Sequence, residues 1–264
     1  MARLPTIFLP HGGGPCFFMD WTPADAWDRM ASWLRGIPGS LPEQPKALLV
    51  ISAHWEEALP TLLTSPAPPL LFDYYGFPPH TYKLAWPAPG APELALQVAA
   101  LLRNVGITTA TNTERGYDHG VFIPLKVAFP DATVPTLQLS LQVGLDPAVH
   151  QAIGRALAPL RDEGVLIVGS GMSFHNMRLF NQPQARAISQ AFDAWLEDAV
   201  SSNASERADL LTTWWRAPLG REAHPREEHL IPLMVTAGAA GGDPGRVVFR
   251  DTVLGAVVSA VQFG

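Results

Sequence analysis

The feature that most constrains this fold is the alternation of short apolar runs with longer segments of helical period. Five apolar runs are bounded by turn residues: TIFLP directly before His11, ALLVIS (47–52), VPTLQLSL (134–141), VLIVGSG (165–171) and GAVVSAVQF (255–263). Because these runs are apolar on both faces, they predict strands buried between layers of helices.

Five longer segments carry the helical pattern: PADAWDRMASWLRG (23–36), APELALQVAALLRNVG (91–106), DPAVHQAIGRALAPLRDEG (146–164), QARAISQAFDAWLEDAV (184–200) and REEHLIPLMVTAGAAGG (226–242), the last interrupted by Pro232. Strand and helix in turn predict an α/β sandwich with a central, mostly parallel or mixed sheet flanked by helices. No internal repeat or low-complexity linker divides the chain, so we expect residues 1–264 to form a single catalytic domain.

Composition narrows the class of partner. A formal net charge of −6 offers no basic face for phosphates, so we expect no nucleic acid and a small-molecule ligand instead. Cys16 is the only cysteine, which excludes an intrachain disulfide and a thiolate zinc cluster; any metal must be held by nitrogen and oxygen. No apolar run reaches the length of a signal peptide or membrane span, so we expect a soluble cytoplasmic protein, with assembly into a homo-oligomer left open.

Three histidines are predicted to lie at the same edge of the sheet. In open α/β sheets ligands bind beyond the carboxyl ends of the strands, and His11, His54 and His175 each follow an apolar run. Any one of them alone is explained as a polar strand end bonded to backbone. Together they converge on one rim, where imidazoles are natural metal ligands.

Two further histidines lie in distinctive stretches, GYDHGVFIPLKVAFP (116–130) and HPREEHLIPLM (224–234). Asp118 beside His119 is positioned to orient an imidazole; the alternative is a turn that caps a helix beginning near Val121. Glu228 and His229 open an apolar helix and could both reach the rim; the alternative is simple capping by acidic residues.

The remaining three histidines are expected to be mostly solvated or capping residues: His80, His150 and His224. The proline-rich segment around the first of them, residues 65–92, predicts a long ordered loop with aromatic side chains. It is interpreted either as a functional loop or as a surface excursion without a role.

Three chemistries compete for these residues. A serine hydrolase needs a G-x-S-x-G elbow, and the nearest stretch, GMSFH (171–175), ends in His175 instead of glycine. A zinc protease needs two histidines on one helical face, but HPREEH separates them by five residues. A non-haem Fe(II) site needs two histidines and a third ligand, which His11 and His54 could supply with Glu228 or His229.

Six ordered motifs then resemble a known family over nearly the whole chain: HGGGP, ISAHW, FDYYGFPPHTYKLAWPAPGAP, YDHGVFIPL, GSGMSFHN and PREEHLIPL. They are similar to the LigB-type (class III) extradiol ring-cleavage dioxygenases, most closely to the small single-chain branch of DOPA 4,5-dioxygenase-like proteins. The first motif departs from the family, where it often reads GHGSP; here Pro10 precedes His11, and Gly13 and Gly14 follow.

The resemblance implies a ligand set and a cofactor. It assigns His11, His54 and His229 to the metal, with Glu228 in reserve, because more distant relatives use a glutamate as third ligand. Fe(II) is expected for activity, with Zn(II) as the alternative in purified protein, because zinc suits imidazole sites almost as well.

The resemblance also implies residue roles. His175 falls on a histidine that lies at the metal and acts as the acid/base; with zinc bound it is also a candidate ligand. His119 falls on a histidine that interacts with oxygen. The implied substrate is a small catechol, DOPA-like or other, whose ring is opened with O2. The aromatic loop with Tyr74, Tyr75, Phe77 and Tyr82 is expected to close over this ring, and Phe77, Tyr82 and His80 are the expected substrate contacts.

Two other functions remain open from the sequence. One is a non-catalytic metal-binding or signalling protein on the same fold, because a fold alone does not guarantee chemistry. The other is a serine hydrolase that uses His11 and Ser173.

Overall fold

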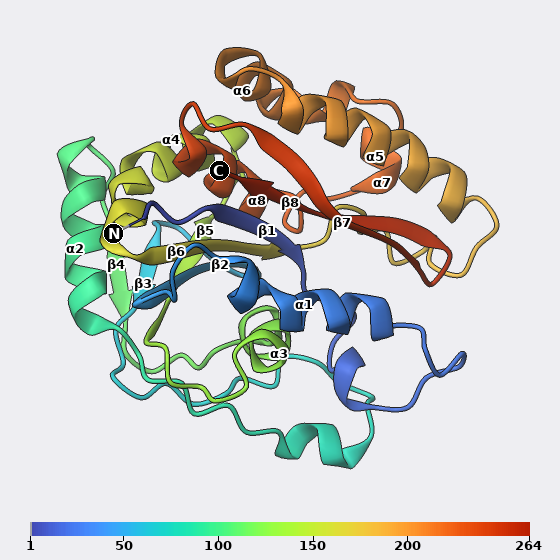
Figure 1. Ribbon diagram of the computed structural model, residues 1–264, viewed down its shortest axis with the longest axis horizontal. Helices are drawn as coiled ribbons and strands as arrows, with labels where there is room; N and C mark the ends of the chain where they lie inside the picture. Colours follow the sequence, from blue (N-terminus) through green and yellow to red (C-terminus); the bar gives the residue numbers. More distant parts are fainter. Residues whose placement is uncertain (1) are drawn as a thin grey trace.

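Eight strands form one mixed sheet in the computed structural model, which describes residues 2–264 (Figure 1). The strands are β1 (Thr6–Pro10), β2 (Ala47–Glu57), β3 (Thr61–Leu63), β4 (Ala110–Asn112), β5 (Thr136–Gln142), β6 (Val165–Gly171), β7 (Gly245–Val253) and β8 (Ala256–Phe263). Their order across the sheet is β4-β3-β5-β2-β6-β1-β8-β7. All five apolar runs are therefore confirmed as strands, namely β1, β2, β5, β6 and β8.

The three strands that the sequence did not predict lie toward the edges of the sheet. β3 and β4 have only three residues each, too short to show a period, and β7 alternates exposed charged residues with half-buried ones. Fully buried strands such as β6 carry an unbroken apolar signal, whereas an exposed edge strand does not.

The strands in the centre run parallel. β2 pairs with β5 on one side and β6 on the other, and β6 pairs with β1, all in parallel register. β8 and β7 extend the sheet in antiparallel fashion beyond β1. Because parallel strands end at the same edge, the carboxyl ends of β2, β6 and β1 lie side by side.

Helices cover both faces of the sheet: α1 (Asp28–Ser40), α2 (Pro92–Asn104), α3 (His119–Ala128), α4 (Pro147–Leu157), α5 (Ala185–Ser201), α6 (Ala204–Thr212), α7 (Gly220–Ala223) and α8 (Ile231–Ala240). α8 packs against β1, β2 and β6, and α4 packs on α8. α1 and α3 lie on the opposite side of the sheet from α5 and α6 (Figure 1). The predicted α/β sandwich with a central mixed sheet is confirmed.

All five predicted helices exist, but two begin later than expected. The segment 23–36 becomes helical only at Asp28 in α1. α8 begins at Ile231, so Glu228 and His229 precede the helix instead of opening it. Pro232 does not interrupt this helix: it occupies the first turn, where its missing N–H has no intrahelical partner to lose.

Between β3 and α2 the chain follows a long path whose one regular element is the short 3₁₀ helix η2 (Pro79–Lys83). Isolated bridges tie this loop to the protein body at Leu70, opposite Tyr117, and at Gly90, opposite Thr136. The ordered loop expected from the prolines is thus present. In the described part of the chain, no helix combines the length and apolarity needed to cross a membrane.

Candidate metal centre and cavity

Five histidines from separate elements meet at the carboxyl edge of the central strands. His11 follows β1 and His175 follows β6, as predicted. His54 does not follow its strand: β2 continues to Glu57, and His54 lies where its register with β5 shifts, between Ile51 and Glu56. His119 is the first residue of α3, and His229 lies two residues before α8.

Backbone hydrogen bonds fasten these chain segments together. His11 N donates to Gly171 O at 3.0 Å, and Met172 N donates to His229 O at 3.0 Å. A Cβ atom on Gly171 would collide with the carbonyl oxygen of His229. Glycine at the end of β6 therefore permits the close approach that brings His229 to the site.

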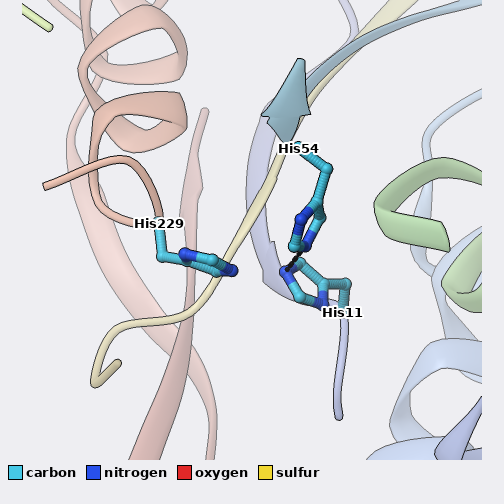
Figure 2. A group of neighbouring side chains, drawn as sticks. All are labelled: His11, His54 and His229. Carbon is cyan, nitrogen blue, oxygen red and sulfur yellow. Dashed lines mark hydrogen bonds between the residues drawn. The ribbon is translucent and has the colours of Figure 1, made fainter. Parts of the chain in front are cut away.

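The imidazoles of His11, His54 and His229 converge on one point (Figure 2). One ring nitrogen of each lies within 4.8 Å of those of the other two. The closest pair is His54 Nε2 and His11 Nε2, 3.2 Å apart. Three imidazole nitrogens at this separation can hold a single cation.

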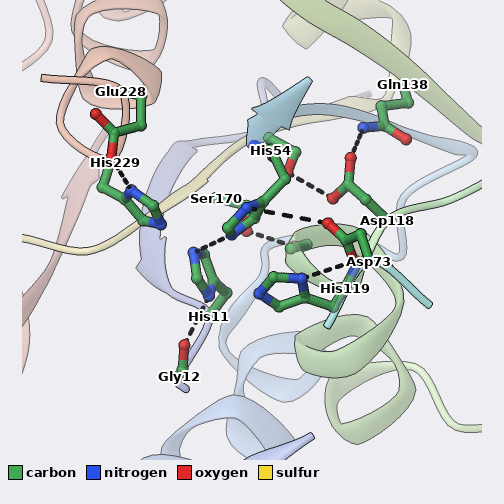
Figure 3. A network of polar contacts seen from close by, with 12 residues as sticks. His11, Gly12, His54, Asp73, Asp118, His119, Gln138, Ser170, Glu228 and His229 are labelled. Atoms are coloured by element: carbon green, nitrogen blue, oxygen red, sulfur yellow. Dashed lines mark hydrogen bonds and ion pairs between the residues drawn. The ribbon is translucent and has the colours of Figure 1, made fainter. Parts of the chain in front are cut away.

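The far nitrogens of two of these rings are bonded away from the convergence point (Figure 3). His11 Nδ1 donates to Gly12 O at 2.8 Å, and His229 Nδ1 donates to Glu228 Oε1 at 2.9 Å. In the neutral tautomers that result, each Nε2 carries a lone pair, the state that a metal ligand requires.

Burial keeps these three imidazoles neutral. The loss of hydration lowers the pKa of His11 and of His229 well below the ordinary value, and the neighbouring histidines lower each further. The same causes, desolvation first and then His119, lower the pKa of His54 to about 4. At neutral pH all three rings therefore present unprotonated nitrogen.

His119 lies beside His54 with a carboxylate behind it. Asp73 Oδ1 accepts hydrogen bonds from His119 Nδ1 at 2.7 Å and from His119 N at 2.9 Å, and its other oxygen lies 4.0 Å from His54 Nδ1. Burial opposes ionisation of Asp73, but the hydrogen bonds from His119 outweigh it and hold its pKa below the ordinary value. An ionised carboxylate thus fixes the orientation of the His119 ring.

Asp73, not Asp118, orients His119, so the predicted role of the adjacent aspartate is wrong. The buried Asp118 carboxylate accepts from Ser52 Oγ at 2.6 Å, Gln138 Nε2 at 2.5 Å and Arg115 at 3.2 Å. Its hydrogen bonds therefore link β2 to β5 near His54. Nothing in the sequence pairs residue 73 with residue 119, because the contact exists only once the proline-rich loop has folded back.

His175 lies on the other flank of the site, against His229. The two rings stack with centroids 3.4 Å apart and 17° between their planes. His175 Nδ1 is 3.4 Å from Glu228 Oε1, the same oxygen that accepts from His229. Burial would raise the pKa of Glu228, but the hydrogen bond from His175 and the charge of Arg226 bring it below its ordinary value.

A cavity of about 440 Å³ opens onto the five imidazoles. The rest of its lining is mostly aromatic and apolar: Gly12, Gly13, Gly14, Trp21, Trp27, Tyr74, Tyr75, Phe77, Met172, Met177, Phe180 and Leu254. Of the three side chains expected at the substrate, Phe77 lines this cavity. Tyr82 lies behind it, its hydroxyl 3.4 Å from Phe77 N, and His80 is exposed and bonded to Phe18 O at 3.0 Å.

Of the four loop aromatics expected to close over the substrate ring, Tyr74, Tyr75 and Phe77 line the cavity. The two tryptophans of the lining were not expected there. Trp21 and Trp27 come from the irregular segment before α1; a helix was predicted from residue 23, and nothing in the sequence assigned either ring to the cavity.

Two histidines outside the site differ from expectation. His150 and His224 are fully buried, so their prediction as solvated or capping residues is wrong. His150 bonds to backbone through both ring nitrogens, whereas His224 Nε2 donates to Ser173 O. His80 is exposed, as predicted.

The serine of the hydrolase alternative is unavailable. Ser173 is buried, its Oγ accepts a hydrogen bond from Ser259 N at 2.7 Å, and it does not line the cavity. The HGGGP segment therefore supplies His11 to a cluster of imidazoles and not an oxyanion loop to a nucleophile.

The chain is similar to proteins with a shared chemistry. A family model described as the catalytic LigB subunit of aromatic ring-opening dioxygenase matches residues 5–261. A protein named 4,5-DOPA dioxygenase extradiol from Beta vulgaris is 37% identical over 96% of this chain and 93% of its own length. Dioxygenase tasH from Hapsidospora irregularis is 35% identical over 100% of this chain and 86% of its own length.

A solved structure agrees with these relatives. The crystal structure of uncharacterized protein JW3007 from Escherichia coli K12 superposes with a TM-score of 0.81 at 28% identity, covering 99% of this chain and 100% of that one. These findings confirm the predicted enzyme class, an extradiol aromatic ring-opening dioxygenase, over the hydrolase and non-catalytic alternatives. Dioxygenases of this class are metal-dependent, and the histidine cluster is a candidate metal site. The chain belongs to the LigB family of aromatic ring-opening dioxygenases.

Proposed function

We propose that this protein is an Fe(II)-dependent extradiol dioxygenase in which His11, His54 and His229 hold the metal. The observation that carries the proposal is the convergence of three buried, neutral imidazoles whose nitrogens lie within 4.8 Å of one another. We further propose that the whole chain forms one catalytic domain, since the three ligands come from its beginning, its first third and its last sixth.

The donor set fits a divalent transition metal. The Nε2 atoms of His11 and His229 each present a lone pair, because hydrogen bonds from Nδ1 to Gly12 O and to Glu228 fix the tautomers. Little reorganisation is therefore needed to bind the metal. Glu228 supports His229 from behind, which favours the histidine over the carboxylate as third ligand. When bound, Fe(II) supplies Lewis acidity and a path for electrons between the aromatic ring and dioxygen. Zn(II) also suits three imidazoles and is expected to compete in purified protein.

His175 is the proposed acid and base of the reaction. A catechol must lose a proton on binding, and a proton must return when the ring opens, so one group near the ring has to serve both steps. His175 lines the cavity, and its Nδ1 faces the ionised Glu228 at 3.4 Å. The other ring nitrogen is thereby left to exchange a proton with the ligand.

His119 is the proposed hydrogen-bond donor to the oxygen that gains negative charge. Its Nδ1 is engaged by Asp73 Oδ1, so its Nε2 is the nitrogen left for the cavity. A protonated His119 beside the ionised Asp73 can donate from both nitrogens at once. A donor fixed in advance where charge develops stabilises the transition state without further reorganisation.

The aromatic lining is proposed to hold the planar ring and to exclude water. Phe77 and Tyr74 pack edge to face, with ring centroids 5.5 Å apart, and leave a dry wall beside the imidazoles. The relatives named 4,5-DOPA dioxygenase support a substrate of the catechol class. Tyr82 and His80 are proposed to act on the substrate only indirectly, by shaping the loop that carries Phe77.

The direct test is to load the protein with Fe(II) without oxygen and then expose it to a panel of catechols in air. We expect a coloured ring-opened product with uptake of one O2 for each ring cleaved. Elemental analysis of the protein as purified decides between iron and zinc. The proposal fails if the iron-loaded protein opens no catechol, or if a variant lacking His54 binds metal as well as the wild type.

A further inference from the structure

Among the residues that the structure describes, the cavity presents no charged anchor for a substrate side chain. Among the described residues that line it, none is a lysine, arginine, aspartate or glutamate. Away from the imidazoles, the side chains of the wall are those of tryptophan, tyrosine, phenylalanine, methionine and leucine. A carboxylate or ammonium group carried into this space would lose hydration without gaining a partner.

The mouth of the cavity is apolar as well. Tyr75 and Met177 line it, yet they are 90% and 72% exposed. Large apolar side chains exposed at the entrance of a pocket are stabilised by a ligand that covers them. A hydrophobic substituent on the catechol ring would bury both.

The glycines of HGGGP allow the aromatic wall to close on the main chain. Gly14 has φ +55°, and a Cβ atom there would lie 2.9 Å from the ring of Phe77. A Cβ atom on Gly13 would lie 3.6 Å from the ring of Trp27. Any side chain at position 14 would meet the ring of Phe77, so glycine at this position keeps the aromatic surface intact.

Three arginines adjoin the site without lining the cavity, and two of them are engaged. Arg226 binds both oxygens of Glu56 at 2.7 and 2.6 Å, and Arg115 bonds to Asp118 and to the His54 carbonyl. Arg178 and Arg226 both line a separate hollow that shares His175 and Met177 with the cavity. Because Arg226 is bound to Glu56, Arg178 is the competing anchor for a carboxylate in that hollow.

We propose that the substrate of this enzyme is a catechol with a neutral, apolar ring substituent, which the wall of Trp21, Trp27, Phe77, Phe180 and Leu254 receives. This inference rests on the catechol ring opening proposed above, and it narrows that substrate class. A catechol amino acid is then a poor substrate of this chain, although several relatives are named for one.

The test compares two ligands that share the catechol ring and a two-carbon chain. Replacing the terminal methyl of 4-propylcatechol by a carboxylate gives dihydroxyphenylpropionate, so the pair differs at the end of the chain, where one member is apolar and the other is charged. Binding is measured without oxygen on the metal-loaded protein by the fluorescence of the tryptophans in the wall, and kcat/KM is measured in air. We expect at least about a tenfold lower Kd and a tenfold higher kcat/KM for the propyl compound, from the cost of burying an unpaired charge. DOPA and dopamine extend the comparison to zwitterionic and cationic chains.

Substitutions at the mouth make the result specific. Met177→Lys should lower the ratio of kcat/KM for the propyl compound to kcat/KM for the carboxylate by at least about threefold, because the lysine supplies a partner for the carboxylate. Met177→Gln controls for the loss of apolar surface, and Leu96→Lys, on the exposed face of α2, controls for added charge alone; neither should favour the carboxylate. Arg178→Ala should leave the preference of the wild type unchanged.

The inference is overturned if the carboxylate, the amino acid or the amine binds as tightly as the propyl compound, if no apolar catechol binds, or if Arg178→Ala selectively weakens carboxylate binding. Failure of the proposed function is a separate outcome: no catechol is then opened by the iron-loaded protein, and the binding comparison still decides the preference.

Discussion

Two groups of buried histidines in this protein look alike by exposure and differ in what their nitrogens touch. In the interior, His150 Nδ1 donates to Asp146 O at 2.7 Å and its Nε2 accepts from Gln142 N at 3.1 Å. At the rim, His11 and His54 turn ring nitrogens toward each other at 3.2 Å. Both nitrogens of His150 are satisfied within the protein, whereas the rim leaves lone pairs facing a common point.

The pKa values do not separate the two groups. Burial lowers the pKa of His150 and His224 just as it lowers that of His11 and His229. A depressed pKa therefore reports a dry environment and not a function. The distinguishing feature is geometric: a cation would stabilise the rim cluster and has no place beside His150, whose nitrogens are already satisfied.

The contrast between the two groups is tested by replacing one histidine of each. His54→Ala should abolish ring opening and reduce bound iron to a small fraction of one equivalent, a loss larger than the roughly tenfold to hundredfold cost of removing a group that only supports a ligand. His150→Ala should keep its metal, at the expense of stability. Elemental analysis after dialysis measures both; full metal content in His54→Ala would contradict the ligand assignment.

Within the rim, His175 is expected to differ from the three ligands. His175→Ala should retain metal yet lower kcat by about a hundredfold or more, the usual effect of removing a general acid and base. His175→Gln, which keeps the polar volume but cannot exchange a proton, should behave like the alanine variant. Turnover close to the wild type in either variant would remove His175 from the mechanism, and loss of metal would make it a ligand.

Asp73 tests how far the carboxylates behind the rim matter. Asp73→Asn keeps an acceptor for His119 N but removes the charge, and we expect about a tenfold to hundredfold fall in kcat/KM with metal retained. The matched control is Asp118→Asn, a carboxylate of the same neighbourhood that does not contact His119. If the two variants lose activity equally and both lose stability, Asp73 has only a structural role.

The sequence predicted the fold where burial is uniform and failed where it is not. Strands such as β6, with every residue buried, and helices with one apolar face carry periodic signals that a single sequence displays. β7 half-exposes its residues, and the start of α1 is delayed to Asp28 by an irregular, tryptophan-containing turn. Tertiary contacts determine the exposure of β7 and the start of α1, and a local sequence pattern does not reveal such contacts.

The candidate site was predicted in the same uneven way. His11 and His175 could be anticipated because parallel strands deliver their ends to one edge. His54 was anticipated for the same reason, but its strand continues to Glu57 and a register shift brings it to the site. The stretches around His119 and around Glu228 and His229 also stood out, but the resemblance to a family was needed to favour His229 over Glu228 and to give His119 a role. Asp73 could not be found, because it approaches His119 only through the fold of a proline-rich loop, and proximity along the chain pointed to Asp118 instead.

The interior group gives the smallest and most quantitative prediction. Burial lowers the pKa of His224 to about 3, while in the unfolded chain it is near the ordinary value of 6.5. Above about pH 6.5 neither state carries the proton and stability is full; below it only the unfolded state gains the proton, so stability falls with pH until the folded pKa is reached. Each pH unit in this window costs about 1.4 kcal/mol of unfolding free energy for this residue.

His224→Leu, which cannot titrate, isolates that contribution. Its stability deficit relative to the wild type should shrink by about 1.4 kcal/mol per pH unit between about pH 6.5 and pH 4, because only the wild type loses the term. Urea unfolding of the metal-free proteins measures the difference in unfolding free energy between variant and wild type. For the control His80→Leu, at an exposed position, this difference should not change with pH. A deficit that stays constant with pH would mean that His224 accepts a proton in the folded protein as readily as in the unfolded chain.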